Sequence, residues 1–138
     1  MTESIEGGCF CGAIRYRAEG KPTNTMICHC ESCRRVAAAP AVPWLTFPTS
    51  SLRFTRGKPK EFSSSEPVRR GFCEACGTML TYAHRKSPDQ IDVTTCSLDD
   101  PNAFPPTHHS WLVDDLTWVK FGDGLPAYPE FRPAPPRA

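Results

Sequence analysis

Three groups of cysteines are the residues of this sequence whose type and spacing most favour chemistry. The first group is C-x-C at Cys9 and Cys11, and the last is C-x-x-C at Cys73 and Cys76. The middle group is C-x-C-x-x-C and occupies residues 28–33. Cysteines spaced this closely direct their sulfurs toward one shared centre, so the spacing predicts metal binding rather than disulfides.

The two outer pairs share a following glycine, Gly12 in the first and Gly77 in the last. A metal-binding knuckle turns sharply after its last cysteine, often through φ > 0, and glycine adopts that conformation at least cost. Together the two pairs supply four thiolates, which is a complete tetrahedral shell for Zn²⁺. We therefore predict a structural zinc site that ties the N-terminal turn to a turn in the middle of the chain.

The middle group supplies one ligand fewer, from Cys28, Cys30 and Cys33, and it is followed by Arg34 and Arg35. Catalytic zinc sites commonly have three protein ligands and leave the fourth position to water or substrate. The sequence therefore predicts a second, catalytic-type zinc, giving two per chain, whose open position accepts an external thiolate. We expect the two arginines to bind a carboxylate of the incoming ligand.

Other interpretations of the middle group start from the lone Cys96 or from oxidation. With Cys96 as a fourth ligand, the group would be a second closed site, and the chain a zinc-stapled binding module without chemistry. The three thiols could instead lose zinc and oxidise as a redox switch. His29 lies between two of these cysteines, and we expect its side chain to face away from the metal.

The composition sets the class of protein. The chain has 138 residues with 15 prolines, 9 glycines and a net charge of +1. Such a chain suits one modest domain and gives no electrostatic case for binding nucleic acid or an acidic membrane surface. The sequence shows neither a signal peptide nor an apolar run of membrane-spanning length, so we expect a cytoplasmic protein. We predict one zinc-binding β domain over residues 1–131 and an extended or disordered proline-rich tail over 132–138.

Short runs of alternating apolar and polar residues predict the strands of a mainly β fold. They lie at residues 14–18, 52–54, 79–82, 90–94 and 118–121. A short helix is predicted over residues 34–39, where Pro40 would stop it. Because the connections are short, the strands are expected to pair mainly in antiparallel fashion.

The order of these motifs resembles the glutathione-dependent formaldehyde-activating enzyme family. The matching segments are G-x-C-x-C-G at 7–12, C-H-C-x-x-C-R at 28–34, F-C-x-x-C-G at 72–77, S-L-D-D-P at 97–101, His109 with Trp111, and D-G-L-P-x-Y at 123–128. The resemblance extends from about residue 7 to residue 131, and the combination is far more specific than any one motif.

This resemblance implies a single small domain of twisted antiparallel sheets of the β-tent type. It implies a structural zinc at the outer pairs and a catalytic-type zinc at the middle three cysteines. The activity implied is that of a carbon–sulfur lyase acting in the direction of synthesis, which joins glutathione to formaldehyde as S-hydroxymethylglutathione. Its partners would be a thiol such as glutathione and a small aldehyde. His109 is a further candidate for contacting substrate, with a structural role as the alternative.

Overall fold

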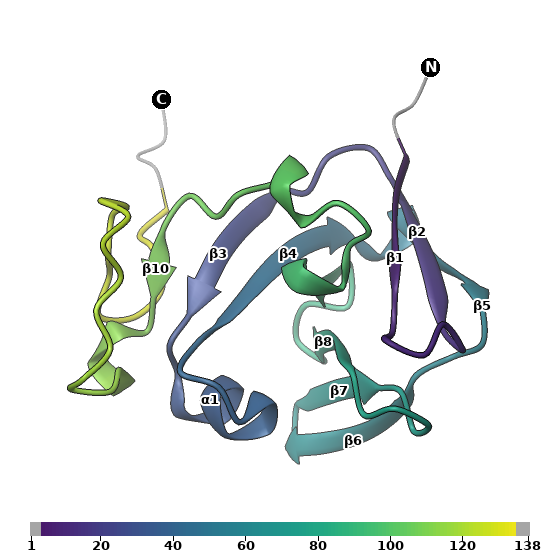
Figure 1. The fold of residues 1–138 in the computed structure, drawn as a ribbon, viewed down its shortest axis with the longest axis horizontal. Coiled ribbons are helices and arrows are strands. Elements are labelled where there is room, and N and C mark those ends of the chain that lie inside the picture. Colours follow the sequence, from purple (N-terminus) through teal and green to yellow (C-terminus); the bar gives the residue numbers. More distant parts are fainter. Residues whose placement is uncertain (1–3, 135–138) are drawn as a thin grey trace. The chain divides into compact units, whose positions relative to one another are not determined.

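The computed structural model describes residues 4–134, and the chain folds as two compact units. Of the described residues, 4–25 and 44–105 form the first unit, and 26–43 and 106–134 form the second. Strands β3 (Asn24–Cys28) and β4 (Val42–Pro48) carry the chain from one unit to the other (Figure 1). Of the predicted tail, residues 132–134 have no regular structure, and residues 135–138 lie outside the described part.

The first unit contains a three-stranded antiparallel sheet near its N-terminal end. Its strands are β1 (Ser4–Gly8), β2 (Arg15–Glu19) and β5 (Leu52–Arg56), in the order β1-β2-β5 (Figure 1). Along β2 the burial alternates, so that Tyr16 and Ala18 face the core while the residues between them are partly exposed. This period of two is what an antiparallel strand with one buried face requires.

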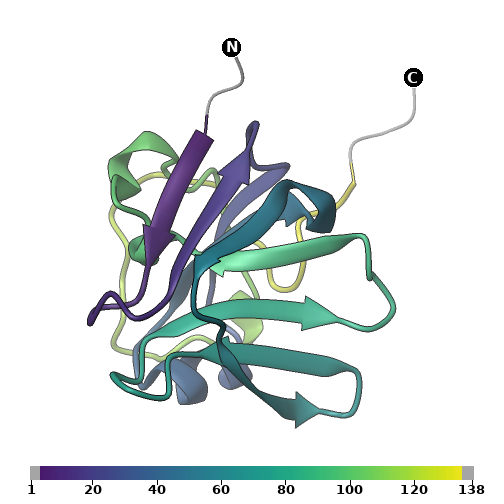
Figure 2. The ribbon, with the colours of Figure 1, turned by 90° about the vertical axis from the view of Figure 1, so that its right-hand side faces the viewer.

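The other strands of the first unit pair in the order β4-β9-β8-β7-β6, and every pair in this series is antiparallel (Figure 2). Besides β4, these strands are β6 (Lys60–Ser65), β7 (Val68–Phe72), β8 (Met79–His84) and β9 (Gln90–Thr94). The 3₁₀ turns of this unit are η1 (Thr49–Ser51), η2 (Thr95–Ser97) and η3 (Pro101–Ala103).

The hydrophobic core of the first unit draws side chains from most of these strands. Its fully buried members include Tyr16, Ala18, Leu45, Phe47, Leu80 and Val93. Cys9 and Cys73, one from each outer cysteine pair, belong to the same cluster. The core thus holds one cysteine of each pair at a fixed place.

The second unit is built around the α-helix and a short parallel pairing. Strand β10 (His109–Ser110) lies parallel to the end of β3, with Ser110 opposite Cys28. Helix α1 (Glu31–Ala37) begins where the Cys30 Sγ accepts a hydrogen bond from the Cys33 N–H at 3.3 Å, and a 3₁₀ turn, η4 (Leu112–Asp114), follows β10. Backbone hydrogen bonds join residues 126–130 to residues 109–113.

The mainly β character is confirmed, and one predicted strand, Gln90–Thr94, has the predicted bounds. The predicted strand at 118–121 is wrong, because this segment is turn and irregular chain, with Trp118 72% exposed. Alternation alone cannot make a strand without a neighbouring strand to pair with. The helix lies at Glu31–Ala37 rather than 34–39 and ends at Ala38 in the left-handed region, before Pro40. Within residues 4–134, no helix has the length and apolarity to cross a membrane.

Candidate metal centres

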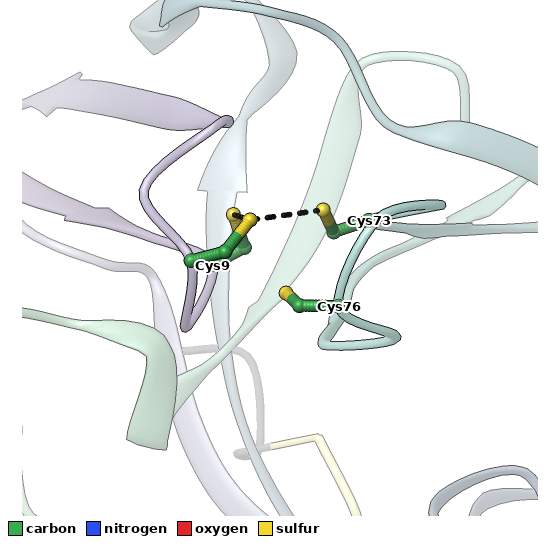
Figure 3. A group of neighbouring side chains, drawn as sticks. Cys9, Cys73 and Cys76 are labelled. Atoms are coloured by element: carbon green, nitrogen blue, oxygen red, sulfur yellow. Dashed lines mark hydrogen bonds between the residues drawn. The ribbon is translucent and has the colours of Figure 1, made fainter.

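The four outer cysteines meet in the first unit. The ligand atoms of Cys9, Cys11, Cys73 and Cys76 all lie within 4.8 Å of one another. Cys9 comes from the loop after β1, and Cys73 and Cys76 come from the turn after β7, so that two separate hairpins face one point (Figure 3). We call these four residues the four-sulfur site.

The glycines that follow these pairs have the predicted backbone conformation. Gly12 has φ 80° and Gly77 has φ 82°, both in the left-handed region. Nothing lies within 4 Å of a Cβ built at either position, so the conformation, not the space, favours glycine. Around the sulfurs, the Ile14 N–H donates to Cys9 Sγ at 3.2 Å, as expected of a metal-binding knuckle.

The sulfur spacing fits a tetrahedral zinc. Zn–S bonds of about 2.3 Å at tetrahedral angles would place sulfurs about 3.8 Å apart. Cys9 Sγ lies 3.6 Å from Cys11 Sγ, and Cys11 Sγ lies 3.8 Å from Cys73 Sγ. All eight cysteines lie in the described residues and none forms a disulfide. The donor set therefore suits zinc, which prefers thiolate ligands in closed structural sites.

Hydrogen bonds make the thiols of this site unequal. Donation from the Thr78 hydroxyl and then from the Thr78 backbone lowers the pKa of Cys76 to about 5. The pKa of Cys11 is raised to about 11, because the neighbouring sulfurs and burial outweigh a lowering hydrogen bond from the Ala13 backbone. Such opposed shifts are typical of crowded thiols that share negative charge. A bound cation would allow all of them to ionise together.

The three middle cysteines also converge, in the second unit. Cys28 ends β3, Cys30 is the N-cap of α1, and Cys33 lies in its first turn. Their sulfurs lie within 4.8 Å of one another, and Cys28 and Cys33 are buried. The neighbouring sulfurs of Cys30 and Cys33, together with burial, raise the pKa of Cys28 strongly. We call these three residues the three-sulfur site; three thiolates so close would be stable together only around a cation.

Cys96 is a member of neither sulfur group in the described residues. It is exposed and sits in η2 of the first unit, and it belongs to neither set of converging ligand atoms.

The two arginines that follow Cys33 differ in environment. Arg34 is partly buried, and its Nε atom is buried without a hydrogen-bond partner in the described structure. Arg35 is exposed, and its Nη1 lies 3.5 Å from Oε1 of Glu31. A buried guanidinium N–H without an acceptor is unusual. Arg34 is therefore the better candidate of the two for binding an anion.

His109 is buried, and both of its ring nitrogens have partners. Its Nδ1 lies 2.9 Å from His29 Nε2, and its Nε2 lies 2.8 Å from Asp123 Oδ2. The contacts of His109 with His29 and Asp123 were not predicted from the sequence, although His29 lies in the C-H-C-x-x-C-R motif and Asp123 in the D-G-L-P-x-Y motif. Burial, followed by the neighbouring His109, lowers the pKa of His29 and favours its neutral form.

The comparison with protein families agrees with this arrangement. The family model described as glutathione-dependent formaldehyde-activating enzyme matches residues 4–114, which contain both sulfur sites. The chain belongs to this family. In this family member, the match ends before Asp123, so the histidine–aspartate contact lies partly outside the matched region.

Two curated relatives and a solved structure are also similar. A Schizosaccharomyces pombe protein named as an uncharacterized lyase is 33% identical over 79 residues, which cover 57% of each chain. A Halomonas elongata protein provisionally named as a glutathione-dependent formaldehyde-activating enzyme is 25% identical over 125 residues, covering 84% of this family member and 80% of its own length. A crystal structure of a Rhodobacter sphaeroides protein has a TM-score of 0.58 at 21% identity, covers 89% of this chain and 98% of its own, and shows a shared fold.

Proposed function

We propose that this protein is a zinc-dependent carbon–sulfur lyase that acts, in the direction of synthesis, on a glutathione-type thiol and a small aldehyde. The observation that carries the proposal is the three-sulfur site, where three converging thiols supply one ligand fewer than a closed site needs. Membership of the family and the names of the two relatives support this choice of chemistry. The four-sulfur site would hold a second, structural zinc.

The reaction joins two molecules without an oxidant or a reductant. The thiol sulfur forms a bond to the aldehyde carbon, the carbonyl π bond breaks, and the thiol proton ends on the former carbonyl oxygen. A zinc ion held by Cys28, Cys30 and Cys33 would supply a fourth position that can bind a thiolate or polarise a carbonyl oxygen.

The protein side chains supply position and charge. Cys28 and Cys33 are buried, which limits the movement of their sulfurs. Arg34 lies on the same helix as Cys33, and its buried Nε–H has no hydrogen-bond partner in the described structure. This donor suits a carboxylate of glutathione. Binding both the reacting sulfur and a remote carboxylate would reduce the entropic cost of the reaction.

A cobalt-substituted protein tests this proposal against the alternative of a closed site. We expect two metal ions per chain by native mass spectrometry, and a change in the cobalt d–d spectrum when glutathione is added. Cys30→Ser should hold one metal ion and lose that spectral response. The protein would not be a thiol-binding enzyme of this kind if millimolar glutathione left the wild-type spectrum unchanged.

Cys96→Ser separates the proposal from the binding-module interpretation. If Cys96 completes the second site, its replacement by serine should alter the cobalt spectrum in the absence of glutathione. The proposal predicts instead an unchanged spectrum and an unchanged response to glutathione, because Cys96 is exposed and belongs to neither group of converging sulfurs.

A further inference from the structure

Backbone hydrogen bonds between β3 and the segment around β10 hold Cys28 in place. The Ile27 N–H donates to the His108 carbonyl, and the His29 N–H donates to the Ser110 carbonyl, both at 3.0 Å. Groups along one edge of a strand recur every second residue, so these two bonds are successive rungs of a parallel ladder. Cys28 lies between the two donors, and its backbone is therefore held from both sides.

A side chain makes the third rung of this ladder. With the same spacing, the next donor is the Glu31 N–H, and the next acceptor would be the Leu112 carbonyl. Instead, Trp111 has φ 62°, in the left-handed region, and the Leu112 carbonyl accepts the Asp115 N–H at 3.1 Å. The Glu31 N–H donates to Asp114 Oδ2 at 3.3 Å. The carboxylate of Asp114 thus takes the place of a main-chain carbonyl.

The three sulfurs of the site lie on two different elements. Cys28 ends β3, whereas Cys30 and Cys33 lie at the start of α1, where the Cys30 Sγ accepts the Cys33 N–H. Glu31 is the first residue of α1, and the N–H of a first helical residue has no acceptor within its own helix. Asp114 supplies that acceptor from the segment that also holds β3. The contact therefore fixes the start of α1 relative to Cys28.

The backbone that carries Asp114 is itself held by the C-terminal part of the second unit. The N–H groups of Trp111, Leu112 and Val113 donate to the carbonyls of residues 128–130 at 3.0–3.1 Å. A residue other than glycine in the left-handed region costs free energy and persists only where its surroundings hold it. Asp114 is partly buried, and its N–H donates to the Trp111 carbonyl at 3.1 Å. Its carboxylate therefore starts from a fixed backbone, as an anchor requires.

We propose that Asp114 is a positioning residue of the three-sulfur site, whose carboxylate anchors the start of α1 and sets where Cys30 and Cys33 place their sulfurs. Its part in thiol chemistry rests on the proposed function. Removing a hydrogen bond that orients metal ligands typically weakens metal binding by about 10- to 100-fold. Because the contact needs only an acceptor oxygen, asparagine should replace aspartate at this position.

Asp114→Ala and Asp114→Asn test the anchor. Asp100→Ala is the matched control, because Asp100 Oδ1 accepts the Asn102 N–H at 3.2 Å at the start of η3, in the first unit. Amide hydrogen exchange followed by NMR in the zinc-loaded, full-length protein measures the contact directly. The Glu31 amide should exchange at least about tenfold faster in Asp114→Ala, and within about threefold of the wild type in Asp114→Asn and Asp100→Ala. An unprotected Glu31 amide in the wild type, or an unchanged rate in Asp114→Ala, would overturn the inference.

Cobalt affinity then tests the effect on the site. In competition with a chromophoric chelator, Asp114→Ala should bind cobalt at the three-sulfur site about 10- to 100-fold more weakly than the wild type. Asp114→Asn and Asp100→Ala should stay within about threefold of the wild type. Cys30→Ser, which lacks the second metal, identifies the affinity of the four-sulfur site, and this affinity should not change in Asp114→Ala. An equal loss in Asp114→Asn or in Asp100→Ala would overturn the positioning role.

Glutathione separates this inference from the proposed function. The cobalt d–d spectrum of the wild type and of Asp114→Asn should change alike when glutathione is added. If the wild-type spectrum did not respond while Asp114→Ala still lost cobalt affinity, the proposed function would fail and the positioning role would stand. If glutathione changed the spectrum while Asp114→Ala bound cobalt as tightly as the wild type, the positioning role would fail and the proposed function would stand.

Discussion

The Thr78 hydroxyl lies 3.2 Å from the Cys76 sulfur and also accepts the Phe10 N–H at 3.0 Å. One side chain thus joins the two hairpins of the four-sulfur site, because Phe10 lies between Cys9 and Cys11. The hydroxyl is free to give its hydrogen to the Cys76 thiolate, which is why the pKa of Cys76 falls to about 5.

Thr78→Val should weaken metal binding at this site by about 10- to 100-fold, the usual effect of removing a supporting hydrogen bond near a ligand. Competition with a chromophoric chelator would measure the change. Thr78→Ser keeps the hydroxyl and should bind metal within about threefold of the wild type. Equal losses in the two variants would show that the threonine methyl group, and not the hydroxyl, supports the site.

The two sulfur sites should differ in their effect on stability. Cys73 is 2% exposed and belongs to the hydrophobic core of the first unit. Cys73→Ser should therefore lower the free energy of unfolding by more than about 4 kcal/mol or prevent folding, because it removes a ligand of a closed site.

Cys30→Ser should lower the free energy of unfolding by less than about 1.5 kcal/mol, because serine is itself a good N-cap for α1. Circular dichroism during thermal unfolding, together with a zinc count, would compare the two variants. If both unfolded the protein to the same extent, the division into a structural and an open site would be wrong.

Replacement of Arg34 should weaken glutathione binding more than replacement of Arg35. Arg34→Gln removes the guanidinium whose Nε is buried and unpaired, and we expect glutathione to bind at least tenfold more weakly. Arg35→Gln removes an exposed partner of Glu31 and should change affinity by less than about twofold. Isothermal titration at two salt concentrations is the measurement, and a larger effect at Arg35 would contradict the assignment.

Asp92 gives the fold a dependence on pH that is independent of the metal sites. Burial raises the pKa of Asp92 to about 6, against a lowering hydrogen bond from Thr46 Oγ1 at 2.6 Å. Because the folded pKa exceeds the usual value of 3.8, the folded state binds the proton more tightly. The stabilisation is complete below pH 3.8 and is lost as the pH rises through 6.

Asp92→Asn should remove this dependence. Relative to the wild type, its free energy of unfolding should rise by about 2 kcal/mol between pH 4 and pH 8, as integration of the two titrations gives. Urea unfolding of both proteins at each pH cancels effects that they share, such as protonation of the cysteines. Asp89→Asn, at an exposed position, should show no such trend. A constant difference between Asp92→Asn and the wild type would contradict the prediction.

Local chemistry made both sulfur sites predictable from the sequence. Cysteine spacing and the glycines at 12 and 77 depend on a few neighbouring residues, and their φ angles are as expected. The contact between His29 and His109 was not predictable in this way, because it depends on a parallel pairing between segments 80 residues apart. The Trp118–Phe121 prediction failed for a related reason, since alternation records which side chains are apolar but not whether a partner strand is present.

The separation of the sulfurs along the chain has a consequence for how the molecule acquires metal. Cys11 and Cys73 are 62 residues apart, whereas the three-sulfur site lies within a stretch of six residues. In an unfolded chain, closing the longer loop costs about 2 kcal/mol more in entropy than closing the shorter one. A nascent polypeptide should therefore capture its first zinc at residues 28–33, before the two outer cysteine pairs meet. The ion that stabilises the folded core would then be the last to arrive.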